Sequence, residues 1–292
     1  MTALAGITLG DWRAQGRDMQ FRGQRIRYWT AGEGEPLLLI HGFPTASWDW
    51  HYLWQPLARR FRVIACDLLG FGYSDKPRGH DYRLLEQADL NQALLAHLGI
   101  DGPVHVLAHD YGDSVAQELL ARHHEGRIQL ASCVFLNGGL FPETHRPVLV
   151  QKLLLSPLGV VVGRLFSRRK LAASFAQVFG PHTQPSEMEL NDFWRLIAEQ
   201  NGPAVMHRLI HYIPERRQQR DRWVAAMQRG GVPLRVIDGA VDPISGAHMV
   251  ARYRELIPDA DTVLLDGIGH YPQTEAPEQV LEHYLAFRDR HV

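Results

Sequence analysis

The segment PVHVLAHDYGDSVAQELLARHHEG (residues 103–126) decides the fold, because it reads as a buried strand, a sharp turn and a helix. An apolar run leads up to the turn, and apolar residues at helical spacing follow it until a glycine ends the segment. Small residues at Ala108 and Gly112 leave room for a tight turn around Asp110. The segment therefore predicts an elbow that displays a carboxylate where a nucleophile is usually presented.

Five other short apolar runs alternate with helix-length amphipathic segments along the chain. This alternation is typical of a mostly parallel sheet covered by helices on both faces. Ahead of the runs, DMQFRG (18–23) and RIRYWTAGEG (25–34) predict an antiparallel hairpin. The sequence thus predicts an α/β fold with eight strands, of which the remaining six fall at 36–42, 61–67, 103–110, 130–138, 233–239 and 261–267.

The alternation stops between Leu140 and Trp223, where apolar residues recur at helical spacing. We interpret this stretch as a helical cap inserted into the core. The predicted division is a first part of the core at 1–139, the cap at 140–223 and a second part of the core at 224–292. A site built on the core should then lie between core and cap.

Composition excludes several classes of function. The 292 residues are 45% hydrophobic and 22% charged, with a formal net charge of −1, so no basic surface for nucleic acid is expected. Sixteen histidines are present, but HExxH and cysteine pairs at zinc spacing are missing, so no metal is expected. GFGYSD (70–75) lacks the third glycine of a dinucleotide loop, and we expect no cofactor. Cys66 and Cys133 fall in buried strands, which favours reduced thiols over a disulfide.

Two segments bear on location. The N-terminal residues lack a basic stretch followed by an apolar run, so we expect no signal peptide and a cytoplasmic protein. LLLSPLGVVVGRLFSRRK (153–170) is apolar and then basic, but Ser156, Pro157 and Arg164 interrupt it too early for a membrane span. We favour a cap helix that lines an apolar pocket over a helix that lies on a membrane surface.

Polar residues that could cooperate with Asp110 follow later strands. Asp242 comes just after one strand and His270 lies in the loop after the last one, which is the chain order of a nucleophile, an acid and a histidine. HGFP (41–44) can offer the backbone N–H of Phe43, which with that of Tyr111 would form an oxyanion hole. Alone, Asp110 could be a helix cap, Asp242 a turn residue and His270 a loop residue. Their order along one chain favours the catalytic interpretation.

The whole chain resembles a known family. HGFPTASWDW (41–50), DLLGFGYSDKP (67–77), HDYGDSVAQELL (109–120) and GHYPQTEAPE (269–278) are similar to α/β-hydrolases of the epoxide hydrolase and haloalkane dehalogenase group, which use an aspartate nucleophile. Within that group, HDYGDSVAQELL together with NGGLFPETHRP (137–147) resembles the mesoderm-specific transcript subfamily and its bacterial relatives. The resemblance implies a hydrolase and leaves its substrate open.

An aspartate nucleophile narrows the chemistry. It is ionised at neutral pH without help from a base. Attack on an sp³ carbon would give an ordinary ester, whereas attack on an acyl carbon would give a reactive anhydride. An epoxide carbon or a carbon bearing a halide is therefore the expected electrophile. His270, oriented by Asp242, would then activate the water that hydrolyses the ester of Asp110.

The leaving group distinguishes the two activities. An opened epoxide needs a proton donor, and the cap offers Tyr212 in LIHYIPER (209–216), with packing as its alternative role. A halide needs N–H donors, which the side chains of Phe43 and Tyr111 lack. Trp194 is a candidate donor in the cap, with packing as its alternative role. His145, at the cap entrance, is a candidate either for substrate binding or for anchoring the cap.

The predicted function is an epoxide hydrolase-like activity on an apolar small molecule, with haloalkane dehalogenation as the second choice. An esterase or lipid-acting hydrolase is a third hypothesis. Against a serine nucleophile, Ser114, the serine nearest to the elbow, lies one turn into the helix and not at the elbow itself. A non-catalytic ligand-binding protein would be expected to have a broken triad, and here the three residues are in place.

Overall fold

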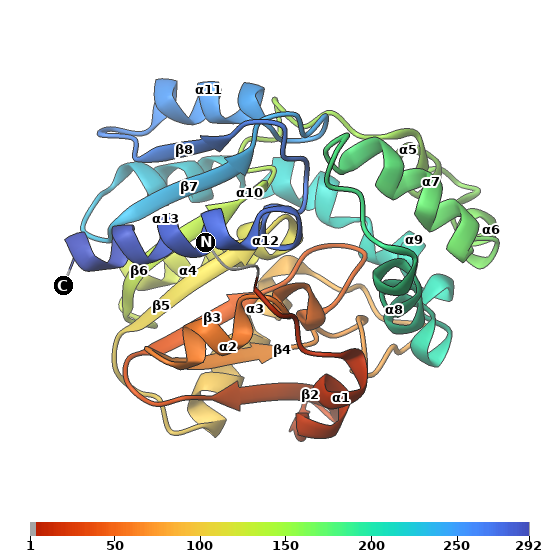
Figure 1. The fold of residues 1–292 in the computed structure, drawn as a ribbon, viewed down its shortest axis with the longest axis horizontal. Coiled ribbons are helices and arrows are strands. Elements are labelled where there is room, and N and C mark those ends of the chain that lie inside the picture. The colour runs from red at the N-terminus through yellow and green to blue at the C-terminus, as the bar shows by residue number, and fades with distance from the viewer. Residues whose placement is uncertain (1–3, 292) are drawn as a thin grey trace.

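The computed structural model describes residues 4–291, which form an eight-stranded sheet with helices on both faces (Figure 1). The strand order is β1-β2-β4-β3-β5-β6-β7-β8. The strands are β1 (Arg17–Phe21), β2 (Gln24–Ala31), β3 (Pro36–Ile40), β4 (Arg62–Cys66), β5 (Val104–His109), β6 (Leu130–Leu136), β7 (Leu234–Gly239) and β8 (Thr262–Leu265).

Strands β3 to β8 pair with one another in parallel. β1 and β2 form the antiparallel hairpin that the sequence predicts, and β2 joins the sheet by antiparallel pairing with β4. The central strands are buried on both faces, since every residue of β5 is buried. Their continuous apolar sequences are typical of such strands. The predicted sheet is therefore confirmed, and the carboxyl ends of β5, β7 and β8 lie along one edge, where the loops that follow them meet.

The helices cover both faces of the sheet. In Figure 1, α2 and α13 lie in front of the sheet and α4 and α10 lie behind it. The helices of the core are α1 (Leu9–Gln15), α2 (Trp54–Ala58), α3 (Leu84–His97), α4 (Tyr111–His124), α10 (Tyr212–Gln228), α11 (Ala247–Leu256), α12 (Pro272–Glu275) and α13 (Pro277–Arg290), with a short 3-10 helix η1 (Ser47–Trp50).

The excursion predicted as a cap lies between β6 and β7, on the right of Figure 1. It contains α5 (Leu149–Leu155), α6 (Gly159–Arg164), α7 (Arg168–Val178), α8 (Glu187–Ala198), η2 (Glu199–Ala204) and α9 (Met206–Leu209). The predicted boundary after residue 223 falls inside α10, which begins in the cap and continues along α4 of the core. A helix can pass from one unit to the other, so periodicity alone does not mark the border.

Tryptophans fill the core beside the hairpin. Trp48 and Trp50 of η1 and Trp54 of α2 are buried. The sequence analysis did not identify α1, a helix of seven residues that Thr8 caps. Its Trp12 stacks on Trp29 with ring centroids 4.7 Å apart. The two cysteines are free and buried, as predicted.

Candidate active site

The elbow predicted around Asp110 is present between β5 and α4. Asp110 has φ of 47°, a left-handed conformation that is uncommon for residues other than glycine. Close packing makes the turn possible, because a Cβ at Gly112 would lie 2.3 Å from the carbonyl oxygen of Ile40. The side chain of Asp110 makes no capping hydrogen bond to α4, so it is not held there as a helix cap.

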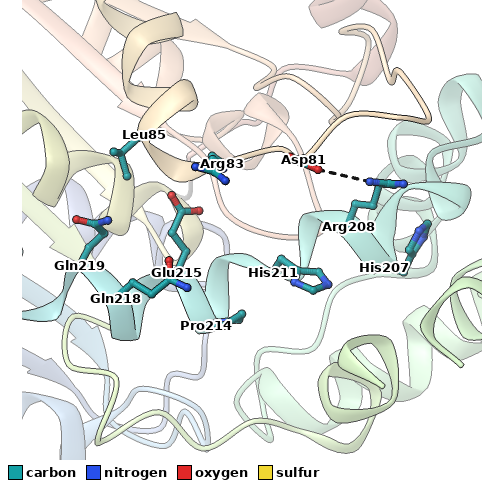
Figure 2. A pocket seen from close by; sticks show the side chains of 10 residues that line it. All are labelled: Asp81, Arg83, Leu85, His207, Arg208, His211, Pro214, Glu215, Gln218 and Gln219. Atoms are coloured by element: carbon teal, nitrogen blue, oxygen red, sulfur yellow. Dashed lines mark ion pairs between the residues drawn. The ribbon is translucent and has the colours of Figure 1, made fainter. Parts of the chain in front are cut away.

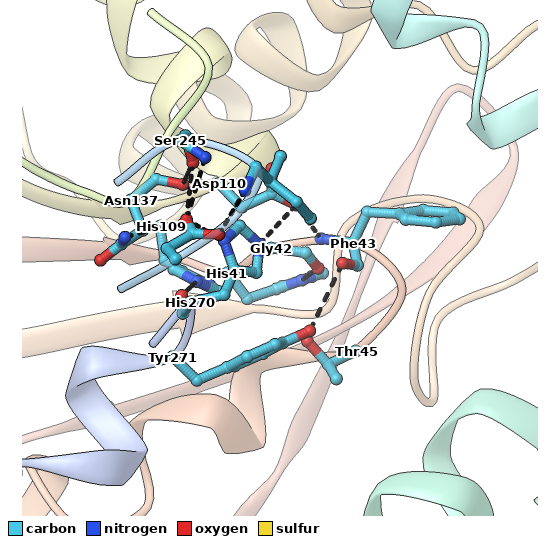
Figure 3. A network of polar contacts seen from close by, with 12 residues as sticks. His41, Gly42, Phe43, Thr45, His109, Asp110, Asn137, Ser245, His270 and Tyr271 are labelled. Atoms are coloured by element: carbon cyan, nitrogen blue, oxygen red, sulfur yellow. Dashed lines mark hydrogen bonds and ion pairs between the residues drawn. The ribbon is translucent and has the colours of Figure 1, made fainter. Parts of the chain in front are cut away.

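The structure brings the three residues of the predicted triad together. Figure 3 shows two of them, Asp110 and His270. His270 Nδ1 donates a hydrogen bond to Asp242 Oδ2 at 2.8 Å. His270 Nε2 lies 4.0 Å from Asp110 Oδ2, on the opposite side of the ring. All three residues are almost completely buried. The histidine is thus oriented by one carboxylate and faces the other.

Asp242 is fixed by donors on both sides. Its Oδ2 accepts hydrogen bonds from Asn137 Nδ2 at 2.9 Å and from Ser245 Oγ at 2.9 Å. Its Oδ1 accepts the backbone N–H of Ile244 at 2.8 Å. A carboxylate that accepts several hydrogen bonds stays ionised when buried. Asp242 can therefore hold the Nδ1 proton of His270 without moving.

The charges of the triad stabilise one another. Burial alone would lower the pKa of His270, but Asp242, and after it Asp110, raise the pKa to about 9. Burial would raise the pKa of Asp110, but the charges of His270 and Arg216 outweigh it and lower the pKa. The resting site therefore holds an imidazolium between two carboxylates, and Asp110 is ionised.

A backbone donor reaches the nucleophile. The N–H of Phe43 donates to Asp110 Oδ2 at 3.1 Å, and Tyr111, whose N–H is the second predicted donor, is the first residue of α4. His41 holds the loop around Phe43, since its Nδ1 donates to the carbonyl of Gly42 and its Nε2 accepts the N–H of Leu68. His41 is thus placed as a support of the loop.

A second histidine, which the sequence analysis missed, supports the loop of His270. His109 is completely buried and its Nε2 donates to the carbonyl oxygen of His270 at 2.8 Å. Burial, and then the charge of His270, lower its pKa to about 3. A neutral His109 can fix the position of His270 without adding charge.

Arg216 is the other residue that the sequence analysis missed. It lies on α10 and is almost completely buried. Its Nη2 donates to the carbonyl oxygen of Asp110 at 2.8 Å and lies 3.5 Å from Oδ1, while its Nε donates to Ser114 Oγ at 2.6 Å. The elbow therefore rests against a buried cation. One signal was available in the sequence, because Arg216 is four residues after Tyr212 and so shares its helix face.

Tyr212 lies beside the nucleophile. Its ring packs against those of Phe43 and Tyr111, and the guanidinium of Arg216 stacks on it. Burial, and then the charge of Asp110, raise its pKa, so the hydroxyl keeps its proton. Gln151 on α5 donates from Nε2 to this hydroxyl at 3.3 Å. The sequence analysis missed Gln151, a polar residue within an apolar run.

The other two candidates of the cap differ in position. His145 lies close to Arg216, and burial and then the charge of Arg216 lower its pKa to about 4. Both of its ring nitrogens are buried without a partner among the described residues. Trp194 is not brought to the site, because it packs against Phe166 and lies beside Arg13 at the outer surface. Its indole faces away because α8 turns its other face inward.

A small apolar cavity of about 40 Å³ leads from the cap to the triad. Its walls on the core side are Phe43, Pro44, Ile244, His270 and Tyr271. On the cap side the walls come from α5, α7 and neighbouring residues, and Gln151 and Ser174 are the polar side chains among them. The space next to His270 and Phe43 thus suits an apolar group.

A larger groove of about 510 Å³ lies elsewhere, along the outer side of α9 and α10 (Figure 2). It is polar, and an ion pair between Arg208 and Asp81 crosses one end. Its walls hold His207 and His211 but no nucleophile with an adjacent base. We therefore place the site at the triad and not in this groove.

Metal-binding residues do not gather in the part of the chain that the structure describes: no group of three or more His, Cys, Asp or Glu there could hold an ion. Within residues 4–291, no helix has both the length and the hydropathy needed to cross a bilayer.

The sequence of the whole chain is similar to those of known proteins. The profile of the alpha/beta hydrolase fold family matches residues 35–277. Mesoderm-specific transcript protein of Mus musculus is 43% identical over 295 residues, covering 96% of this chain and 87% of that protein. LipZ of Mycobacterium tuberculosis, named as a hydrolase, is 39% identical, and the match covers 94% of this chain and 96% of that protein. A cis-3-alkyl-4-alkyloxetan-2-one decarboxylase of Shewanella oneidensis is 28% identical, and the match covers 91% of this chain and 85% of that protein.

Solved structures share the architecture. An alpha/beta hydrolase fold protein from Burkholderia ambifaria is 25% identical, with a TM-score of 0.79 over 97% of this chain and 99% of that one. The epoxide hydrolase CorEH is 22% identical, with a TM-score of 0.75 over 93% of this chain and 97% of that one. The likeness to CorEH is one of fold.

Proposed function

The chain belongs to the alpha/beta hydrolase family, and on that premise we propose that it hydrolyses its substrate through an ester on Asp110, with a strained cyclic ether as the electrophile. One observation carries the proposal. Asp110 occupies the elbow with Oδ2 accepting the N–H of Phe43, and it faces a histidine that Asp242 orients. An ionised carboxylate at this position can attack carbon without a base.

In the first step, Asp110 attacks an sp³ carbon of the ring. The N–H of Phe43 binds Oδ2, so we assign the attack to Oδ1. The new bond joins Oδ1 to carbon, the ring C–O bond breaks, and its electron pair goes to the ring oxygen. His270 is not needed as a base in this step, which agrees with its raised pKa.

The ring oxygen needs a proton as it leaves. The hydroxyl of Tyr212 keeps its proton, the ring packs against Phe43 and Tyr111 next to the elbow, and Gln151 donates a hydrogen bond to the hydroxyl from the cap. We assign Tyr212 as the proton donor and the N–H of Gln151 as a second donor to the developing charge. Gln151 thus supplies a donor that the sequence analysis did not find in the cap.

In the second step, water attacks the carbonyl carbon of the ester. Alkylation removes the negative charge of Asp110, which had helped to raise the pKa of His270. The pKa of His270 then falls, its proton returns through solvent to the phenolate of Tyr212, and neutral His270 can take the proton of the water. The carbonyl oxygen of the ester, near Phe43, becomes negative, and the N–H groups of Phe43 and Tyr111 would stabilise it. Collapse expels the substrate oxygen as an alkoxide, which takes the proton of the new carboxylic acid and leaves as the alcohol. This restores the ionised Asp110 beside a protonated His270.

Two observations support a small apolar substrate with a strained oxygen ring. The cavity walls beside His270 and Phe43 are mostly apolar. One relative is named for its action on an oxetan-2-one, which is a four-membered oxygen ring. The apolar walls favour an apolar substrate, and the name of the relative shows that a protein of similar sequence acts on a strained oxygen ring. An epoxide is the smallest substrate of this kind.

Haloalkane dehalogenation is the second candidate, and Gln151 is the observation in its favour, since its N–H lines the cavity. Against it, the side chains of Phe43 and Tyr111 have no N–H, and Trp194 lies away from the cavity. We therefore rank it below ring opening.

The proposal is tested by trapping the ester in His270→Gln. This variant should complete the first step and then stop, because the base for the second step is gone. Intact-protein mass spectrometry with a reactive epoxide should show one added substrate mass, and peptide mapping should place it on Asp110. A haloalkane would add the alkyl group alone and release an equal amount of halide.

The matched control is the double variant Asp110→Asn with His270→Gln, which should gain no mass. A serine mechanism predicts no accumulation in His270→Gln, because histidine would be needed for the first step. Label on any other residue, or no label with an epoxide that the wild type turns over, would refute the proposal.

A further inference from the structure

The outer face of the cap exposes large apolar side chains. We define the cap patch as Leu149, Leu153, Leu158, Val160, Val161 and Leu165. Among residues 4–291, only Met188 and Val241 are further large hydrophobic residues with comparable exposure. The six residues come from α5, α6 and their flanks, and in Figure 1 these helices lie at the edge of the cap away from the sheet. The patch is therefore a local feature of one surface.

The orientation of α6 is the reverse of a normal surface helix, which turns its large apolar residues inward. Its two glycines face the protein instead. A Cβ at Gly159 would lie 2.0 Å from the carbonyl oxygen of Leu154, and one at Gly163 would lie 2.6 Å from that of Pro203. The small residues are thus required inside, and the valines between them are turned outward. The exposed apolar face follows from how α6 packs.

The charge of this segment is strongly one-sided. Between Glu143 and Glu187 the sequence contains no Asp or Glu, although the whole chain has 32 acidic and 31 basic residues. The segment carries six basic residues, Arg146, Lys152, Arg164, Arg168, Arg169 and Lys170. Arg168 pairs with Glu187 at the end of the segment. An apolar face flanked by basic side chains matches the interface of an anionic bilayer.

One of the helices that carry the cap patch, α5, also forms part of the cap wall of the cavity. Leu154 of α5 and Leu171 and Phe175 of α7 line it, close to His270. A surface that binds the cap patch would therefore lie on the other side of one helical layer from the cavity. This arrangement suits an enzyme whose apolar substrate is concentrated in lipid.

We propose that the cap patch docks on the surface of an anionic lipid bilayer, with α5 and α6 lying in the interface. The valines and leucines enter the boundary between headgroups and acyl chains, and the basic residues bind the headgroups. The helices are too short to cross the membrane. The inference does not depend on the ester mechanism, because binding can be measured without turnover.

The test is co-sedimentation with vesicles of phosphatidylcholine alone and of equal parts phosphatidylcholine and phosphatidylglycerol. The wild-type chain should bind the anionic vesicles at least about tenfold more strongly, and added salt should weaken the binding. Leu158→Glu with Val161→Glu should lower the partition coefficient by at least about tenfold, because two apolar side chains leave the interface. Met188→Glu is the matched control, since Met188 is 72% exposed and Leu158 is 65% exposed.

The outcomes separate the possible occupants of the patch. Both variants should keep the melting temperature of the wild type, because the changed residues are exposed. Equal loss in Met188→Glu, or no binding to anionic vesicles, would overturn the proposal. A dimer of the wild type that the double variant abolishes, without vesicle binding, would assign the cap patch to a second copy of the chain and would also overturn it.

Discussion

Arg216 Nη2 lies 2.8 Å from the carbonyl oxygen of Asp110 and 3.5 Å from its Oδ1, so a buried guanidinium touches both the backbone and the side chain of the proposed nucleophile. It touches the nucleophile from α10, while β5 and α4 form the turn itself. We regard Arg216 as a positioning residue. The same guanidinium group stabilises the ionised carboxylate of Asp110 and holds the turn in its left-handed conformation.

Replacing Arg216 tests this role. Arg216→Gln should lower the free energy of unfolding by about 3 kcal/mol, because a buried ion pair loses one partner. It should also raise the pKa of Asp110, so the acid limb of the alkylation rate moves to higher pH. The rate is measured by mass spectrometry in the His270→Gln background, where the ester accumulates.

The controls for Arg216 are close in sequence. Arg217→Gln changes an exposed neighbour and should alter neither quantity. Arg216→Lys should restore part of the shift in the acid limb. An acid limb that does not move, in a variant that is destabilised, would show that Arg216 serves the fold alone.

Neutralising Asp110 should change the titration of His270. Asp110→Asn carries the same charge as the ester, and the pKa of His270 should fall from about 9, because one of the carboxylates that raise it is gone. Asp242 keeps the pKa from falling further. NMR titration of His270 measures the shift, and Glu143→Gln, which changes a carboxylate at the surface, is the control. An unchanged pKa would mean that Asp110 does not control the base.

Proton donation in the cap can be tested with two substitutions. Tyr212→Phe should slow epoxide opening by roughly 10², the usual scale of general acid catalysis. Gln151→Leu should slow it less, because the hydroxyl remains. Single-turnover formation of the ester measures both effects. A rate in Tyr212→Phe equal to the wild type would remove Tyr212 from the mechanism.

The raised pKa of His270 also predicts how stability depends on pH. A histidine whose pKa is higher in the folded state stabilises the fold while it is protonated in both states. This contribution is complete below about pH 6.5, the unperturbed value, and is lost as the pH rises through about 9. Urea unfolding should therefore show a decrease of at most about 3 kcal/mol across this window. The His270→Gln variant should be nearly flat there, and an equal decrease in that variant would contradict the assignment.

The sheet and the order of the triad were predictable because their signals are local. Each strand is a short apolar run, and Asp110, Asp242 and His270 each follow one of these runs directly. Parallel strands then bring the three loops to one edge. The role of Gly112 could also be anticipated, since a turn of this kind needs a small residue beside it.

The pairing of Arg216 with Asp110 was not predictable, because the two residues are 106 positions apart. The four-residue spacing from Tyr212 places Arg216 on the same helix face, but it does not show that this arginine reaches Asp110. Trp194, in contrast, was predicted at the site and lies outside it. Its indole N–H made it a candidate donor, but only the packing of α8 shows that it faces away from the cavity.

The path of α10 restricts how the cap can move. This helix runs without a break from Tyr212 to Gln228, and Trp223 and Arg222 fasten it to Glu118 of α4. The C-terminal end of the cap is therefore joined to the core by a continuous helix, whereas its N-terminal end is joined to the core only by the loop at 137–148. Tyr212 and Arg216 lie on this helix, so their position is fixed by the core and does not depend on how α5 to α9 pack.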